Sequence, residues 1–241
     1  LRRICSSLPR TASVLLLLFT STALFTMGAI AFVQVPLQSL LSQAMQRFLG
    51  YETMLQWVLL TGIPAVLLSG LVQEGAKLLP VLVFFKLNQP PDARAGLTIG
   101  AIAGAGFGIF EAQWALNLVF ASGWTWGWVQ SFGFQALLGF WKRFFAVAFH
   151  IAATAIAAYG LWRGKWWQFY LLASLLHALT NYGELLLRAG SLTAFQTEMY
   201  GAGLALMTMA VALWLRWRPA GPSETGSGSG MERGGSTPLQ A

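Results

Sequence analysis

Residues 95–120, AGLTIGAIAGAGFGIFEAQWALNLVF, decide the fold class. Glu111 is the one ionisable side chain in this run, and a helix of that length is about 39 Å long, enough to cross a hydrocarbon core of about 30 Å. Four of its glycines recur at every fourth position: Gly96, Gly100, Gly104 and Gly108. Small residues at this spacing let a second helix approach closely, and Glu111 continues the same face. The stretch therefore predicts a membrane-spanning helix that packs Glu111 against a neighbour.

The composition of the whole chain agrees with a membrane protein. Of its 241 residues, 56% are hydrophobic and only 10% are charged, against roughly 25% charged in an average soluble domain. Such a chain has too few polar residues to cover a soluble surface, which excludes a soluble globular enzyme. We expect an all-α, polytopic transmembrane helical bundle.

The apolar runs predict six spans, at about residues 13–33, 54–87, 95–120, 134–161, 166–187 and 198–216. The second run is long enough to cross twice, which would make seven. Six crossings are favoured because they leave most Lys and Arg residues on one side, the cytoplasmic side by the positive-inside rule. We expect an integral, multi-pass plasma-membrane protein with a cytoplasmic N-terminus.

The chain outside the spans is short. Residues 36–47 are predicted to form an amphipathic surface helix. Residues 1–217 are expected to form one membrane-embedded helical domain, and the Gly/Ser/Pro-rich residues 218–241 a disordered tail. The single cysteine, Cys5, cannot form an internal disulfide.

The charge balance is positive, with 15 Lys and Arg against 8 Asp and Glu, a formal net charge of +7. The basic residues lie at the ends of apolar segments, and no basic stripe with interleaved polar residues is present. This arrangement predicts contact with the lipid bilayer and no binding of nucleic acid.

Ionisable side chains inside a span are costly and are functional candidates by default. These residues, with one buried amide, are Glu74, Lys77, Glu111, Arg143, His150, His177 and Asn181. They lie at similar depths in four spans, and spacings of three, four or seven residues place several of them on shared helix faces. We therefore expect them to meet in one polar site near the middle of the bilayer.

Two glutamates and two histidines suit the activation of water. A carboxylate can act as the general base, and His and Asn side chains can donate hydrogen bonds to a developing oxyanion. The same residues could instead bind a divalent metal such as zinc, with Glu111, His150 and His177 as candidate ligands, although the HExxH spacing is absent. A proton-coupled membrane transporter is the competing class, because intramembrane Glu and His residues also form proton relays.

Four motifs in order resemble a known family. They are QEGAK (73–77), GAGFGIFEAQ (104–113), RFFAVAFHIAATAIAAYG (143–160) and LHALTNYG (176–183). This order is similar to that of the PrsW family of intramembrane proteases and, more distantly, of the type II CAAX prenyl endopeptidase and bacteriocin-processing superfamily. The resemblance covers residues 60–185.

The resemblance implies an intramembrane endopeptidase that cleaves a membrane-anchored protein, for example an anti-sigma factor, in or near its transmembrane segment. It implies catalytic roles for five residues: Glu74, Glu111, His150, His177 and Asn181. Lys77 and Arg143 would support them, and a metal is an open matter for the family.

One position departs from the family pattern, because Gln73 stands where the resemblance implies the first Glu of a pair. Gln cannot take a proton. Either Glu74 or Glu111 must then serve as the base, or the chain is a non-catalytic pseudoprotease scaffold that binds substrate segments.

Overall fold

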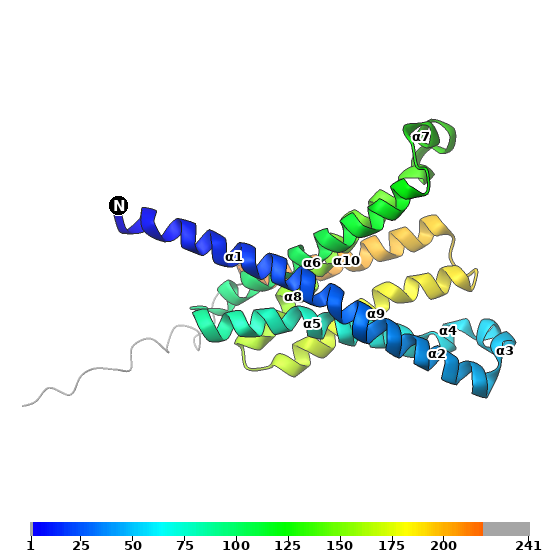
Figure 1. Cartoon of the computed structure of the whole chain (residues 1–241), viewed down its shortest axis with the longest axis horizontal. Coiled ribbons are helices and arrows are strands. Elements are labelled where there is room, and N and C mark those ends of the chain that lie inside the picture. The colour runs from blue at the N-terminus through cyan, green and yellow to red at the C-terminus, as the bar shows by residue number, and fades with distance from the viewer. Residues whose placement is uncertain (1, 219–241) are drawn as a thin grey trace, which may run out of the picture.

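The computed structural model describes residues 2–218, with side chains from Ala12 onward, and this part of the chain is helical with no strands (Figure 1). The prediction of an all-α membrane bundle is confirmed. The tail expected after Arg218 and the side chain of Cys5 lie outside what is described.

Seven helices of fifteen residues or more form the body of the molecule. They are α1 (Arg2–Ala29), α2 (Val35–Leu49), α5 (Ile63–Asn88), α6 (Ala93–Ala121), α8 (Leu138–Trp162), α9 (Trp166–Arg188) and α10 (Ala194–Trp217). The shorter elements are the π-turn η1 (Ile30–Gln34), α3 (Tyr51–Gln56), α4 (Val58–Thr61), α7 (Trp126–Phe132) and the 3₁₀ turn η2 (Gly133–Leu137). Figure 1 shows α3, α4 and α7 at the end of the bundle opposite the N-terminus.

Within the described residues, five segments are long and apolar enough to cross a membrane: Ala12–Leu49, Val58–Asn88, Ala93–Ala121, Trp126–Trp162 and Ala194–Trp217. Helix α9, predicted as a span at residues 166–187, is not among these five segments. It is a long helix that carries His177, Asn181 and Glu184. Each of these residues has a partner on another long helix, Glu74 and Ser69 on α5 and Lys142 on α8, so α9 can belong to the bundle without being strongly apolar.

The run at residues 54–87 forms one long helix, α5, preceded by the short helices α3 and α4. Pro64 lies in the first turn of α5, where its missing N–H has no partner to lose. A single crossing here favours six spans over seven.

Helix α2 differs from the surface helix expected at residues 36–47. It continues α1 through η1, so that residues 12–49 form one long helical segment. Pro36 would break a regular helix, since it has no N–H to donate. The wider π-turn directly before it accommodates this loss.

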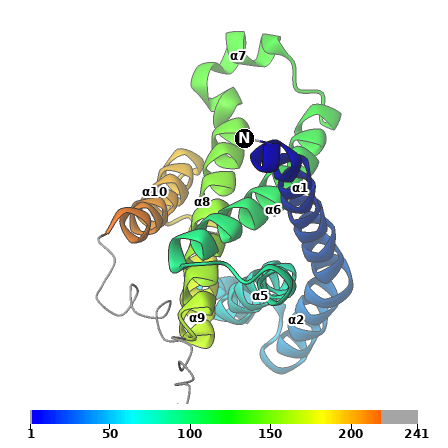
Figure 2. The ribbon, with the colours of Figure 1, turned by 90° about the vertical axis from the view of Figure 1, so that its left-hand side faces the viewer.

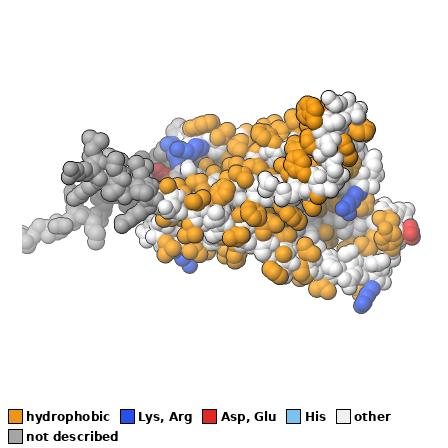
Figure 3. Space-filling model, turned by 45° about the horizontal axis from the view of Figure 1, so that its top comes forward, with side chains coloured by type: hydrophobic (Ala, Val, Ile, Leu, Met, Phe, Trp, Pro, Cys, Tyr) orange, Lys and Arg blue, Asp and Glu red, His pale blue; other side chains and the backbone are white. Residues whose placement is uncertain are grey.

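The outer surface matches a lipid environment. Hydrophobic side chains cover the sides of the molecule in Figure 3, and Lys and Arg side chains gather at its two ends. At one end, the guanidinium of Arg94 donates to the carbonyl of Arg218 (2.6 Å) and the indole of Trp162 donates to that of Pro90 (3.0 Å). The protein is an integral membrane protein, and the cytoplasmic location of its N-terminus stays a prediction.

Helices α6 and α8 cross at the centre of the bundle in near-backbone contact (Figure 2). A Cβ atom on Gly100 would lie 2.6 Å from the carbonyl oxygen of Thr154, and one on Gly104 would overlap the carbonyl oxygen of His150. A Cβ atom on Gly108 would likewise lie 3.2 Å from the Cβ of His150. The glycine face of α6 thus presses directly on the turn of α8 that carries His150.

Candidate active site

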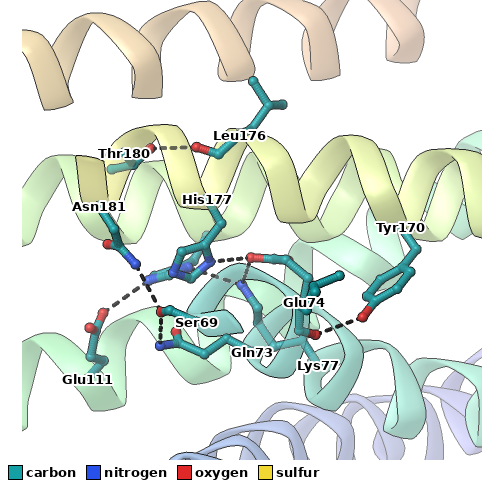
Figure 4. Close-up of polar contacts among 12 residues, drawn as sticks. Ser69, Gln73, Glu74, Lys77, Glu111, Tyr170, Leu176, His177, Thr180 and Asn181 are labelled. Carbon is teal, nitrogen blue, oxygen red and sulfur yellow. Dashed lines mark hydrogen bonds and ion pairs between the residues drawn. The ribbon is translucent and has the colours of Figure 1, made fainter. Parts of the chain in front are cut away.

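The polar residues of α5, α6, α8 and α9 converge in the bundle interior (Figure 4). At the centre, the ammonium of Lys77 lies 2.6 Å from Oε1 of Glu74, and both side chains are fully buried. The two residues are three apart on α5, which places them on one face. Unpaired charges are costly in such a place, so each stabilises the other.

Glu74 also receives a hydrogen bond from α9. Nδ1 of His177 lies 2.7 Å from Oε1 of Glu74. A carboxylate only accepts, so Nδ1 of His177 carries the proton and Nε2 keeps a lone pair when the ring is neutral. The second carboxylate oxygen, Oε2 of Glu74, is buried and has no hydrogen-bond partner in the part of the chain that the structure describes.

His150 connects Lys77 to Glu111. Lys77 Nζ lies 3.1 Å from Nδ1 of His150, and Nε2 of His150 lies 3.0 Å from Oε2 of Glu111. An ammonium has donors only. Nδ1 therefore accepts from Lys77, and the ring proton on Nε2 is donated to Glu111.

Two basic residues at the start of α8 have acidic partners on other helices. Arg143 Nη1 lies 3.8 Å from Oε1 of Glu111. Lys142 pairs with Glu184 on α9 and lies 3.7 Å from Glu198 on α10. These ion pairs supply acidic partners for both cations within the span.

A cavity of about 110 Å³ opens beside the cluster. Glu111, His150, His177, Asn181 and Gln73 all line it, and the Lys142 ion pairs lie at its edge. Glu74 and Lys77 are not among its lining residues. The structure therefore brings the predicted site residues together. It divides them into a buried pair, Glu74 and Lys77, and a group that lines the cavity.

A network of amides and one hydroxyl lies next to the cluster, and sequence reasoning missed two of its members. Ser69 Oγ lies 3.0 Å from Nδ2 of Asn181 and 3.3 Å from Nε2 of both Gln73 and Gln34. Nε2 of Gln73 also donates to Oε1 of Gln34 (3.0 Å). Gln34 could have been noticed in the sequence as a lone amide at the end of the first apolar run. The sequence does not show which helices it contacts.

Three buried side chains could hold a metal ion. Ligand atoms of Glu74, His150 and His177 lie within 4.8 Å of one another. Two imidazoles and a carboxylate are a common zinc donor set, and the unpartnered Oε2 of Glu74 offers a free ligand atom. The residues fit a divalent metal, provided that the Lys77 ammonium leaves His150. Glu111, expected in the sequence-derived ligand set, contacts His150 instead of joining this group.

Comparison with known proteins identifies a family. A family model described as PrsW family intramembrane metalloprotease matches residues 10–215, most of the chain. No curated protein and no solved structure matches.

Proposed function

Because the chain belongs to the PrsW family of intramembrane metalloproteases, we propose that it is an endopeptidase that cuts a membrane-anchored protein in or near its transmembrane segment. The observation that carries the proposal is the meeting of Glu111, His150, His177 and Asn181, from three helices, around one cavity inside the bundle. An enclosed polar site is what hydrolysis of a peptide bond within lipid requires, because water and catalytic groups must both be held there.

We assign the role of general base to Glu111. Its side chain is 25% exposed and lines the cavity, whereas Glu74 is fully buried against Lys77 and His177. A base must be within hydrogen-bond reach of the water that it deprotonates. Glu111 would take the proton of a water in the cavity, and Glu74 would hold its two partners in place.

His150 and Arg143 orient Glu111 for this step. His150 donates to one carboxylate oxygen at 3.0 Å, and Arg143 approaches the other at 3.8 Å. Without a metal, Lys77 in turn fixes the ring of His150 through Nδ1, and a metal ligated by His150 would take the place of this contact. Such a chain of contacts keeps the base in one position, which reduces the reorganisation needed during reaction.

Asn181 is suited to stabilise the oxyanion that develops on the scissile carbonyl. Its side-chain amide has two N–H donors, and Ser69 takes one of them at 3.0 Å. The other is available to the substrate. His177 can assist in its protonated form, when Nε2 is also a donor.

A divalent metal held by Glu74, His150 and His177 would act as a Lewis acid that polarises the scissile carbonyl. His177 has the surroundings expected of a ligand, because it donates its other ring N–H to a carboxylate. The chain's own residues still have to bind the substrate, supply the base and exclude excess water.

The substrate is a membrane-anchored protein, and a regulatory protein such as an anti-sigma factor is the class that the family resemblance suggests. A comparison of membrane-protein N-termini by mass spectrometry, in cells that express wild type or Glu111→Gln, tests the proposal. New termini in or near a transmembrane segment, seen only with wild type, support it and name the substrate.

Equal sets of termini, with both proteins well expressed, would contradict the proposal. They would favour the pseudoprotease or the transporter. A measurement of substrate-driven proton flux in liposomes distinguishes these two alternatives. Flux would identify a transporter, and stable binding of a membrane protein without flux or cleavage would identify a scaffold.

A further inference from the structure

Gln73 carries a buried acceptor beside the cavity. The residue is only 7% exposed and is one of the cavity-lining residues, and its carbonyl oxygen Oε1 has no hydrogen-bond partner among the described residues. A buried polar atom left unpaired costs free energy. Such an atom next to a reaction site is a place where a ligand can supply the missing donor.

The orientation of this amide is set from the first helical segment. Nε2 of Gln73 donates to Oε1 of Gln34 at 3.0 Å and lies 3.3 Å from Oγ of Ser69 (Figure 4). With the nitrogen end held in this way, the oxygen end of the amide has to point away from Gln34. Gln34 is itself 8% exposed and ends the π-turn η1, a kind of turn that is frequent at functional sites.

A transmembrane substrate brings the matching donor. In a helix its peptide N–H groups are paired within the chain, so the scissile region has to unwind before water can reach a carbonyl carbon. Each N–H freed in this way costs several kcal/mol in a lipid environment. A neutral acceptor at the cavity wall would stabilise the unwound segment without competing for the proton that the base takes.

We propose that Gln73 is a substrate-binding residue whose Oε1 accepts a hydrogen bond from a backbone N–H of the unwound substrate, and that Gln34 is the positioning residue that keeps this oxygen turned toward it. The proposal rests on the protease function above. It gives Gln73, where the related motif has a Glu, a binding role in place of an acid–base role, because Gln can accept a hydrogen bond but no proton.

The test uses full-length protein in liposomes and a synthetic peptide covering the transmembrane segment of the substrate found by the N-terminal comparison. Six peptides each replace one backbone N–H around the scissile bond by an ester oxygen. With wild type, one of these esters should lower kcat/KM about tenfold, the effect of losing one hydrogen bond to a desolvated acceptor. With Gln73→Met, the same ester should have less than a twofold effect, and kcat/KM for the all-amide peptide should already be about tenfold lower through KM.

Two further variants separate binding from folding. Gln113→Met is the matched control, since Gln113 is exposed and donates a hydrogen bond to Asn117 on its own helix, and it should keep the full ester effect. Gln34→Met should weaken the ester effect without changing Gln73 itself. If Gln73→Met responds to every ester as wild type does, the binding role is wrong. If wild type cleaves none of the peptides, the protease function fails and the inference falls with it.

Discussion

Replacement of Lys77 by Met should strongly destabilise the protein. The Lys77 ammonium lies 2.6 Å from the Glu74 carboxylate with both side chains fully buried, and 3.1 Å from His150. Removing one member of a buried ion pair leaves the other charge without compensation and typically costs about 3–5 kcal/mol. The double variant Glu74→Gln/Lys77→Met removes both charges and should recover most of this loss, to within about 1–2 kcal/mol of wild type.

Reversible unfolding in mixed micelles, followed by tryptophan fluorescence, gives the free energies for this cycle. Lys142→Met is the matched control, because Lys142 also pairs with a Glu but is 37% exposed at the cavity edge, where such a pair is worth about 1 kcal/mol or less. The reasoning is refuted if Lys77→Met costs no more than Lys142→Met. It is equally refuted if the double variant is less stable than Lys77→Met alone.

Three further predictions concern the base, the helix contact and the metal. Glu111→Gln should lower kcat in the peptide assay by about 10²- to 10⁴-fold, while loss of its partly exposed pair with Arg143 costs about 1 kcal/mol or less of unfolding free energy. More than a tenth of wild-type activity would exclude Glu111 as the base. Gly104→Ala should cost about 1–3 kcal/mol of unfolding free energy in the micelle assay, because the added Cβ would overlap the carbonyl oxygen of His150. Gly203→Ala is the control, because nothing lies within contact distance of a Cβ at that position. It should be neutral or stabilising by up to about 1 kcal/mol. A chelator should abolish cleavage and added zinc should restore it, and His177→Ala should lower the zinc content measured by elemental analysis; full activity in metal-free protein would contradict the metal role.

The helices were predictable because apolar run lengths set them. The run at residues 95–120 corresponds to α6, Ala93–Ala121. The run at residues 166–187 corresponds to α9, Trp166–Arg188. The meeting of the polar residues followed from similar depths in successive spans, since unpaired charges in lipid are costly. These arguments need only one helix at a time.

The partners within the site were not predictable, because they depend on how each helix is rotated against its neighbours. The sequence grouped Glu111 with the two histidines as metal ligands, whereas Glu74 is the carboxylate that lies with both of them. Periodicity gives the face of a helix but no rotation between helices. The role of Gln34 was missed for the same reason, since its contact with Gln73 joins residues 39 positions apart.

The pairing of the buried charges also bears on how the chain enters the membrane during synthesis. Glu74 and Lys77 lie on the same helix, so α5 can leave the insertion machinery already neutral. Glu111 finds Arg143 on the next long helix, and an α6–α8 hairpin needs nothing made later to hide either charge. The partners of Lys142, on α9 and α10, are made later, but its side chain is 37% exposed and lines the cavity. For these two ion pairs, the order of residues along the chain thus shortens the time during which a charged side chain lies in lipid without its partner.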